Sequence, residues 1–290
     1  MNWNGSNMRN KSEQVSILLD ALPFIKRYNN EIFVIKYGGS AQIRPELKEK
    51  FARDIVLMYL VGIKPVIVHG GGLAIGNMLE RLNIDSHFID GLRVTDEKVM
   101  EVVEMVLSGS INKEITALLN EHGAQALGVS GKDASMLKAK PINMDKYGYV
   151  GDISSVDPKV INNLIADKFI PVIAPIATGQ SPGHPGFNIN ADIAAGHIAA
   201  SLQARKIIFM TDTSGVMSDN DETIHTLSHN EISTLKEKGV IDGGMIPKVD
   251  ACLHAVNGGV NKAHIIDGRI EHALLLEIFT SDGVGTVIKL

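Results

Sequence analysis

The chain has 290 residues, of which 44% are hydrophobic and 21% are charged. This is ordinary globular usage and excludes a disordered or fibrous protein. The formal net charge is −5 and no basic block is present. Binding to nucleic acid or to an anionic membrane is therefore not expected.

Targeting and redox signals are also absent from the sequence. The polar N-terminus lacks the apolar stretch of a signal peptide. The longest apolar run, around residues 55–63, is too short to span a membrane. Cys252 is the only cysteine and cannot form an intrachain disulfide. We therefore expect a soluble α/β protein of the cytoplasm.

Short β-branched runs alternate with longer helical patterns along the chain. The expected strands are Ile32–Lys36, Pro65–His69, Ala126–Val129, Ile170–Pro175, Lys206–Thr211 and Ala263–Ile266. The expected helices lie near Pro45–Leu60, Leu73–Leu82, Asp96–Leu107, Ile111–His122, Asp157–Ala166, Asn190–Leu202, Asn230–Lys238 and Gly244–Val256. Apolar strands separated by helices of this length predict a parallel sheet covered on both faces. The alternating stretch Leu137–Gly151 predicts a β-hairpin instead.

The chain divides at two places. Thr178–Gly186 is rich in Gly and Pro and is the best candidate for a boundary between two lobes. Before the first strand, a helical pattern has Ser12 as a candidate N-cap. Its apolar face would consist of Val15, Leu18, Leu19, Leu22 and Ile25. The predicted parts are an amphipathic helix over 1–28, a first lobe over 29–180 and a second lobe over 181–290.

Ligands of open parallel sheets bind at the carboxyl ends of the strands, and two glycine loops lie there. The first strand ends in Lys36-Tyr37-Gly38-Gly39, and the second ends in His69-Gly70-Gly71-Gly72. Glycines let backbone N–H groups approach a phosphate, and three of them opening a helix form an anion site. We interpret His69 as a packed or hydrogen-bonded residue rather than a base.

A second lysine-and-glycine unit occurs in the C-terminal half. Asn188 and Asn190 lead into a helix whose first turn contains Asp192, and Asn190 is a candidate N-cap. Further along, Gly243-Gly244 precedes Lys248 in the first turns of another helix. Two such units in one sequence favour phosphate chemistry over two unrelated, solvated lysines.

Other motifs fail when their spacing is counted. Neither the Walker nor the Rossmann glycine pattern is present. The string Gly179–Gly183 matches a hydrolase nucleophile elbow, but Pro182 has no N–H to donate to an oxyanion. The acidic loop 219–222 lacks the glycine and distal glutamate of a calcium loop. From the histidines we expect no metal site built by the protein.

Six strings occur in a characteristic order. They are Lys36-Tyr37-Gly38-Gly39, His69-Gly70-Gly71-Gly72, Gly91-Leu92-Arg93-Val94-Thr95, Asn188-Ile189-Asn190-Ala191-Asp192, Thr211-Asp212-Thr213-Ser214-Gly215-Val216 and Gly244-Met245-Ile246-Pro247-Lys248. Together they closely resemble the amino acid kinase superfamily, and within it the N-acetyl-L-glutamate kinases of arginine biosynthesis. The resemblance implies a three-layer αβα sandwich around a central, mainly parallel sheet. It also implies an acceptor-binding, dimer-forming first lobe and an ATP-binding second lobe.

The implied reaction transfers the γ-phosphoryl group of ATP to the side-chain carboxylate of N-acetyl-L-glutamate. The acceptor is already ionised at neutral pH, so no general base is needed. By resemblance, the catalytic residues are Lys36, Lys248 and Asp192. The acceptor would be bound by Gly71, Gly72, Arg93 and Asn188. ATP would be bound by Lys36, Gly38, Gly39, Thr211, Asp212 and Lys248. Mg²⁺ is expected on the ATP oxygens and water, without a protein ligand.

The strings Lys262–Arg269 and Leu276–Thr280 look like those of arginine-inhibited members, in which an N-terminal helix joins dimers into a hexameric ring. The resemblance implies a homodimer that forms a homohexamer. It also implies arginine as an inhibitor, bound by Lys206, His264, Gly268 and Glu277. Several alternatives stay open: docking of the N-terminal helix on its own lobe, an acetylaminoadipate kinase with an acceptor one methylene longer, and a non-catalytic arginine sensor. Binding of a PII-type signalling protein is also left open.

Overall fold

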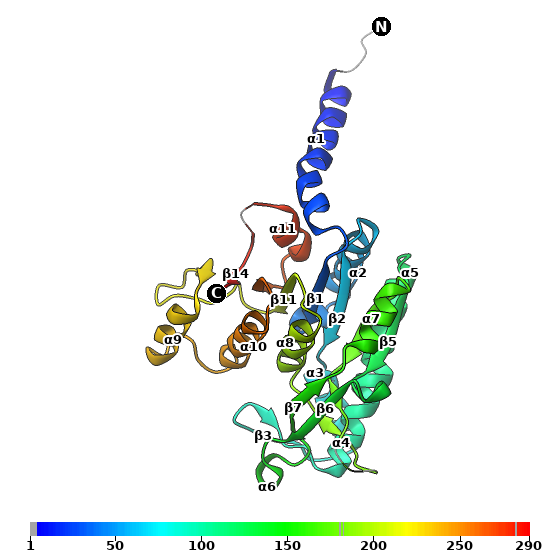
Figure 1. The fold of residues 1–290 in the computed structure, drawn as a ribbon, viewed down its shortest axis with the longest axis vertical. Helices are drawn as coiled ribbons and strands as arrows, with labels where there is room; N and C mark the ends of the chain where they lie inside the picture. Colours follow the sequence, from blue (N-terminus) through cyan, green and yellow to red (C-terminus); the bar gives the residue numbers. More distant parts are fainter. Residues whose placement is uncertain (1–4, 180, 182, 282) are drawn as a thin grey trace.

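The core of the fold is one eight-stranded sheet (Figure 1). The computed structural model describes residues 5–179, 181, 183–281 and 283–290, with all their side chains except those of 5–14, 17 and 18. In spatial order the strands are β12 (Thr226–Leu227), β14 (Thr286–Ile288), β13 (Lys262–Asp267), β11 (Lys206–Thr211), β1 (Ile32–Tyr37), β2 (Lys64–His69), β8 (Ile170–Ala174) and β5 (Ala126–Ser130). Within the described part of this sheet, only the β13–β14 pair is antiparallel. The predicted, mainly parallel sheet is therefore confirmed.

Alternate strand residues enter two separate cores, one on each face of the sheet. Phe33 and Ile35 pack into the first core, while Val34 packs into the second. Helices that contribute to the first core are α2 (Pro45–Leu60), α3 (Gly72–Arg81), α4 (Glu97–Glu104), α5 (Asn112–Glu121) and α11 (Ala273–Phe279). Those that contribute to the second are α7 (Lys159–Ala166), α8 (Ala191–Ser201), α9 (His229–Glu237) and α10 (Met245–Asn257). This is the three-layer αβα sandwich that was expected.

Smaller elements lie outside the main sheet. They are a 3₁₀ turn η1 (Gly39–Gln42), a 3₁₀ turn η3 (Asp133–Ser135), α6 (Met144–Tyr147), and the strand pairs β3 (Phe88–Ile89) with β4 (Leu92–Arg93), β6 (Leu137–Pro141) with β7 (Gly151–Val156), and β9 (Ile176–Ala177) with β10 (Phe187–Asn188). The hairpin predicted over Leu137–Gly151 exists but is longer, because its second strand runs to Val156 and its connection contains α6.

One helical segment differs from the prediction. The pattern predicted separate helices near Asp96–Leu107 and Ile111–His122, but a π-helical segment η2 (Met105–Ile111) joins α4 to α5. The segment contains Ser108-Gly109-Ser110, residues with weak preference for a regular α-helix. A π-bulge of this kind is often found near a functional site.

Helix α1 (Gly5–Tyr28) extends away from the rest of the molecule. It begins before Ser12, so the prediction of Ser12 as N-cap is wrong. On the predicted apolar face, Val15, Leu19 and Leu22 are 55%, 60% and 41% exposed, whereas the side chain of Leu18 lies outside the described residues. Ile25, nearer the base of the helix, is half-buried. The part of this face formed by Val15, Leu19 and Leu22 therefore does not dock on its own lobe.

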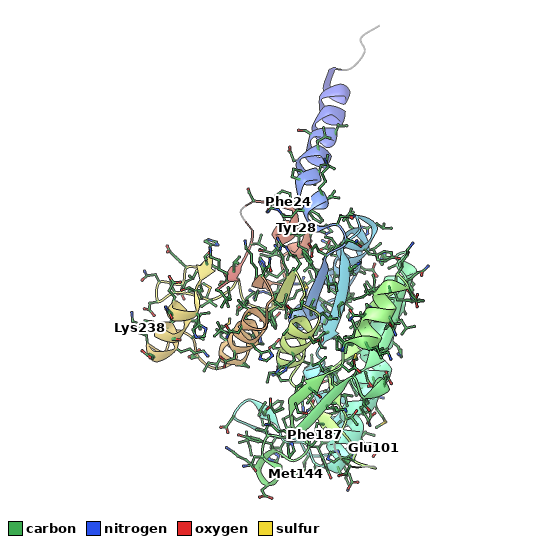
Figure 2. The ribbon with its side chains drawn as sticks, in the orientation of Figure 1. Phe24, Tyr28, Glu101, Met144, Phe187 and Lys238 are labelled. Atoms are coloured by element: carbon green, nitrogen blue, oxygen red, sulfur yellow. The ribbon has the colours of Figure 1, made fainter. Side chains whose placement is uncertain are left out.

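The base of α1 is anchored next to α11. Tyr28 is buried and packs edge-on against Phe33, with 5.1 Å between the ring centroids. Phe24 is partly buried against the same core, and Figure 2 shows both side chains where α1 meets the body. Helix α11 is tied to α2 in turn, since His272 Nδ1 lies 2.6 Å from Asp54 Oδ1. In the described part of the chain, no helix combines the length and apolarity needed to cross a membrane.

Candidate active site

Lys36, Asp192 and Lys248 form a buried charged group at the carboxyl end of the sheet. Lys36 lies one residue before the end of β1, and its Nζ is 3.1 Å from Asp192 Oδ1. Lys248 lies in the first turn of α10, and its Nζ is 3.0 Å from Asp192 Oδ2. The two lysines therefore meet at one carboxylate, although they are far apart in the sequence.

The local sequence explains why Asp192 is in this position. The Asn190 side chain accepts hydrogen bonds from the backbone N–H groups of Asp192 and Ile193, so it caps α8 as predicted. Asp192 is thereby placed in the first turn of α8, only 4% exposed. Burial alone would raise the pKa of this carboxyl, but the two ammonium groups outweigh burial and hold the pKa below its usual value. Asp192 is thus an anion between two cations at neutral pH.

The two glycine loops lie beside this charged group and border one cavity of about 400 Å³. Its lining includes Lys36 and the glycines predicted to donate N–H groups, namely Gly38, Gly39, Gly71 and Gly72. A Cβ on Gly38 would lie 2.8 Å from Lys36 Nζ, and Gly39 has a φ of +68°. Both positions therefore favour glycine. The predicted residues of both loops are brought together.

A second cavity of about 410 Å³ lies on the side of Lys248. Thr211 and Lys248 line this cavity, together with Gly215, Val216 and Gly244. The first cavity contains Lys36 and the second contains Lys248, so Asp192 connects residues of both. A group transferred between molecules in the two cavities would pass close to both ammonium groups.

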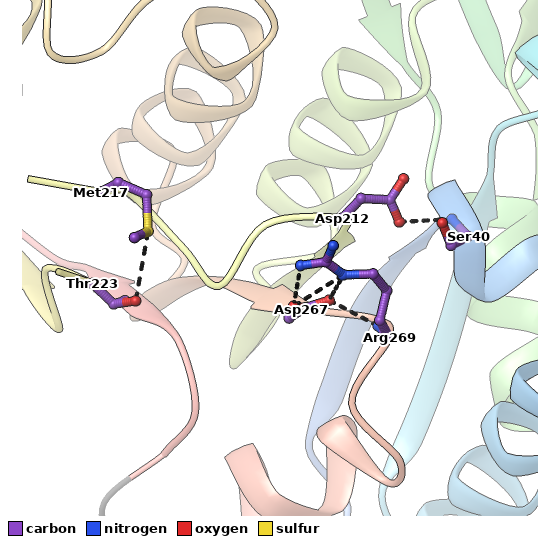
Figure 3. Close-up of polar contacts among 6 residues, drawn as sticks. All are labelled: Ser40, Asp212, Met217, Thr223, Asp267 and Arg269. Atoms are coloured by element: carbon purple, nitrogen blue, oxygen red, sulfur yellow. Dashed lines mark hydrogen bonds and ion pairs between the residues drawn. The ribbon is translucent and has the colours of Figure 1, made fainter. Parts of the chain in front are cut away.

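Asp212 has a different position from the other residues predicted to bind ATP. Its Oδ1 accepts a hydrogen bond of 2.7 Å from the backbone N–H of Ser40, as Figure 3 shows. A Cβ on Gly39 would also lie 2.7 Å from this oxygen. Asp212 therefore holds the loop that follows β1 against the end of β11.

Arg93 and Asn188, predicted to bind the acceptor, form a connected set that meets the first cavity at Gly72. Arg93 donates to the carbonyl oxygen of Gly72 at 2.8 Å, and its guanidinium stacks 4.5 Å above the Phe88 ring. Asn188 Nδ2 donates to Thr95 Oγ1 at 3.2 Å, and Thr95 Oγ1 donates to the Arg93 carbonyl at 2.8 Å. Buried Thr95 thus links Asn188 to Arg93.

The predicted effector residues lie together toward the amino ends of β11 and β13, with one exception. Glu277 Oε1 is 2.6 Å from His264 Nδ1, and Glu277 Oε2 accepts from the backbone N–H of Val284 at 2.8 Å. Lys206 Nζ lies 5.0 Å from the centroid of the Tyr28 ring. Burial would raise the pKa of Glu277, but His264 and its other neighbours hold the pKa below its usual value.

Gly268 is the exception. It lies beyond the other end of β13, where its N–H donates to the Thr211 carbonyl at 2.8 Å. Its neighbours Asp267 and Arg269 form an ion pair with each other there (Figure 3). The structure therefore does not bring Gly268 together with Lys206 and Glu277.

Several residues that support the site were missed by the sequence analysis. The Gln42 side chain donates to the Gly70 carbonyl at 2.9 Å, and Thr95 joins the acceptor residues as described. Asn112, 1% exposed, contacts His69. Each of these contacts joins residues that are far apart in the sequence. Thr95 lies within one of the six strings, but no local pattern marks Gln42 or Asn112.

Comparison with known proteins identifies the family of this chain. The model of the amino acid kinase family matches residues 31–267. An acetylglutamate kinase from Nitratiruptor sp. is 62% identical over 281 residues, which cover 97% of this chain and 99% of that protein. Another from Sulfurimonas denitrificans is 62% identical over 283 residues, covering 98% of this chain and 100% of that protein.

A solved structure supports the fold assignment. N-acetylglutamate synthase from Neisseria gonorrhoeae, complexed with coenzyme A and N-acetyl-glutamate, matches with a TM-score of 0.84 and 26% identity. The match covers 95% of this chain, which spans 63% of the length of the synthase chain. The chain therefore belongs to the amino acid kinase family, and within it to the acetylglutamate kinases, the carboxyl-acceptor phosphotransferases of arginine biosynthesis.

Proposed function

We propose that Lys36, Asp192 and Lys248 carry out the transfer of the ATP γ-phosphoryl group to the side-chain carboxylate of N-acetyl-L-glutamate. The observation that carries this proposal is the pair of lysines held 3.1 and 3.0 Å from one buried carboxylate, each bordering a different cavity. Acceptor and donor are both anionic, so the main obstacle is electrostatic. Two ammonium groups between the cavities lower that obstacle.

Each residue has a defined task in this proposal. Lys36 and Lys248 bind opposite sides of the transferring group, and Asp192 keeps both ammonium groups turned toward it. The N–H groups of Gly38 and Gly39 serve phosphate oxygens, and those of Gly71 and Gly72 serve phosphate and carboxylate oxygens. Thr211 lines the ATP cavity, whereas Asp212 supports ATP binding by fixing the loop after β1.

Arg93 and Asn188 are proposed to bind the acceptor. A guanidinium can pair bidentately with the α-carboxylate, and an amide can satisfy the acetamido group. Arg93 donates to Gly72 and stacks on Phe88. Its guanidinium would therefore bind the α-carboxylate of the acceptor next to the glycine loop. The proposed division into lobes over 29–180 and 181–290 assigns the acceptor mainly to the first lobe and ATP mainly to the second.

Mg²⁺ is proposed to arrive with ATP. Among the described residues, no cluster of three or more His, Cys, Asp or Glu side chains is arranged to bind a metal ion. Both oxygens of Asp192 already face lysines. The phosphate oxygens and water would therefore hold the ion, where it neutralises phosphate charge, and the steps assigned to this chain's residues do not involve a protein–metal bond.

Formation of the acyl phosphate tests the catalytic part of this proposal. The protein, supplied with ATP and Mg²⁺, should convert N-acetyl-L-glutamate to a product that hydroxylamine traps as the hydroxamate. Glutamate and acetylaminoadipate serve as the comparison acceptors and should react far less. Lys36→Ala and Lys248→Ala should each lower kcat by about 100-fold or more, with smaller changes in KM. Lys168→Ala, an exposed lysine outside the site, is the control. Wild-type turnover in either active-site variant would remove that lysine from the mechanism.

Feedback inhibition by arginine forms the second part of the proposal. Glu277 would pair with the guanidinium, and Lys206 would bind the carboxylate end of the ligand. Tyr28, the last residue of α1, lies against Lys206, so the cluster contacts the N-terminal helix directly. A ligand bound here inhibits only if it binds one arrangement of the lobes better than another.

The exposed apolar face of α1 supports a homohexamer. We expect the protein to act in the cytoplasm. Val15, Leu19 and Leu22 would be buried against the equivalent helix of another subunit. Deleting residues 1–26 should give active dimers that are much less sensitive to arginine. Leu19→Asp in the full chain should weaken the same assembly without shortening the protein. Light scattering and arginine titration measure both. A full-length protein that is dimeric and indifferent to millimolar arginine would contradict this part and leave the kinase assignment unchanged.

A further inference from the structure

The carbonyl group of Gly70 is fixed by two side chains from different parts of the chain. Gln42 Nε2 donates to this oxygen at 2.9 Å, and His69 Nδ1 lies 3.1 Å from it. The N–H of Gly70 donates to the Tyr37 carbonyl at 3.0 Å. Gly70 is therefore bonded at both its N–H and its C=O, unlike an ordinary residue of a glycine-rich turn.

Asn112 determines which nitrogen of His69 carries the proton. The Asn112 amide nitrogen donates to the Val172 carbonyl at 2.9 Å, which establishes that Nδ2 faces this region. The same Nδ2 lies 3.2 Å from His69 Nε2. An amide NH₂ can only donate, so Nε2 must accept. The single proton of the neutral ring is then on Nδ1, where it is donated to the Gly70 carbonyl.

The surroundings of His69 keep the ring in this neutral form. The side chain is fully buried, and burial lowers the pKa of His69 to about 4, with a smaller contribution from the nearby Lys113 charge. A buried, neutral imidazole with both nitrogens occupied has no capacity left to act as a base. Its remaining effect is on the direction of the Gly70 carbonyl.

That direction decides where the next N–H points. A peptide unit is planar and its C=O and N–H groups point in opposite directions. Fixing the Gly70 oxygen between Gln42 and His69 therefore also fixes the N–H of Gly71, which lines the first cavity. In the described part of the chain, this N–H donates to no protein acceptor. It is free to donate to a ligand.

We propose that His69, oriented by Asn112, acts with Gln42 as a set of positioning residues that aims the Gly71 N–H at the transferring phosphoryl group. This rests on the proposed function, in which that N–H serves phosphate or carboxylate oxygens. Glycine loops lose much conformational freedom when they are ordered, so a donor in such a loop is effective only if the protein has fixed it beforehand. Because Gln42 comes from the loop after β1, the same contact aligns the two glycine loops.

Two substitutions at His69 test the aiming role. His69→Leu removes the donor, whereas His69→Asn keeps an amide N–H at the position of Nδ1. We expect His69→Leu to lower kcat by about 10- to 100-fold, with the KM for ATP changed by less than about twofold. His69→Asn should recover most of the lost kcat. Gln42→Leu should also lower kcat. Because Gln42 is partly exposed, this substitution should disturb folding less than a substitution of the buried His69.

A matched pair of asparagines separates aiming from stability. Asn112 and Asn120 both lie on α5, and both bond to backbone groups of the sheet. Of the two, Asn112 contacts His69. Both Asn112→Ala and Asn120→Ala should lower the urea midpoint, but only Asn112→Ala should lower kcat, by about tenfold or more.

The outcomes distinguish this inference from the proposed function. A wild-type protein that forms no acyl phosphate from N-acetyl-L-glutamate refutes the proposed function itself. If the wild type is active but folded Gln42→Leu and Asn112→Ala keep kcat within about twofold of the wild-type value, the aiming role is refuted. The proposed function would then still stand. Equal rates for His69→Asn and His69→Leu would also refute it, since retention of a donor would then make no difference.

Discussion

Replacing Asp192 by asparagine should show how much of the stability and of the rate depends on one carboxylate. The change keeps the shape of the side chain and its place in the first turn of α8, but it removes the charge between two lysines. The side chains of Lys36, Lys248 and Asp192 are 11%, 19% and 6% exposed, so solvent screens their interaction little. At an effective dielectric constant of about 20, charges 3.0 Å apart attract by about 5–6 kcal/mol before desolvation is counted.

The net loss is smaller than this attraction. Removing one partner of a buried ion pair costs about 3–5 kcal/mol in the free energy of unfolding. We expect about 3 kcal/mol for Asp192→Asn, because both lysines border cavities and can turn toward water. The reaction should slow more strongly, with kcat lowered about 100- to 1,000-fold, since neither ammonium group stays aimed at the transferring group.

Urea unfolding and the hydroxamate assay measure the two effects. Asp90→Asn is the matched control, because Asp90 pairs with Lys146 at 2.7 Å on the surface. That substitution should leave stability and kcat almost unchanged. The pKa of Asp192 lies below its usual value in the folded protein, so its contribution is complete above about pH 4 and is lost as the pH falls through the folded pKa. A difference in stability no larger than that of Asp90→Asn, or one that does not shrink in acid, would refute the ion-pair reasoning.

Three further predictions follow from the packing and from the titration of single residues. Gly71→Ala should lower the free energy of unfolding by about 1–3 kcal/mol, because its Cβ would lie 2.4 Å from Ile111 Cδ1. A Cβ on Gly72 meets nothing within 4 Å, so Gly72→Ala should not lower the free energy of unfolding in this way. Urea midpoints compare the two variants. Arg93→Lys should raise the KM for N-acetyl-L-glutamate and not that for ATP in steady-state assays, and equal rises would indicate a folding defect. Burial raises the pKa of Asp54 to about 6 despite its histidine partner, so the folded state takes up the proton more readily than the unfolded state. Relative to Asp54→Asn, the wild-type protein should lose about 2 kcal/mol of stability between about pH 4.5 and about pH 7 in urea titrations, and a flat difference would show that this group does not titrate there.

The sheet could be predicted where its strands are long and apolar. Runs of β-branched residues coincide with β1, β2, β8 and β11, and the neighbouring helices have clear apolar faces. β12 and β14 have only two and three residues, too few for periodicity to mark them. The junction of α4 and α5 was missed because a π-helical turn keeps the chain helical across a segment that favours a break.

The charged group of the site could also be predicted, but its support could not. Lys36, Lys248 and Asp192 occur within recognisable strings, each at the start or end of an element. The contact of Ser40 with Asp212 joins residues 172 positions apart, and that of Asn112 with His69 joins residues 43 apart. Such pairs depend on the order of strands in the sheet, which local patterns do not specify.

The central place of β1 has a consequence for how the chain acquires its fold. β1 pairs with β2 soon after it in the sequence, but its other edge pairs with β11, so that Phe33 lies beside Lys206. Until Lys206–Thr211 has been synthesised and has docked, the segment Ile32–Tyr37 exposes an open, apolar strand edge. Such edges can pair with other chains, and contacts between residues so distant in sequence form slowly. During synthesis, the strand that carries Lys36 therefore keeps an edge open to pairing with other chains until the second half of the chain arrives.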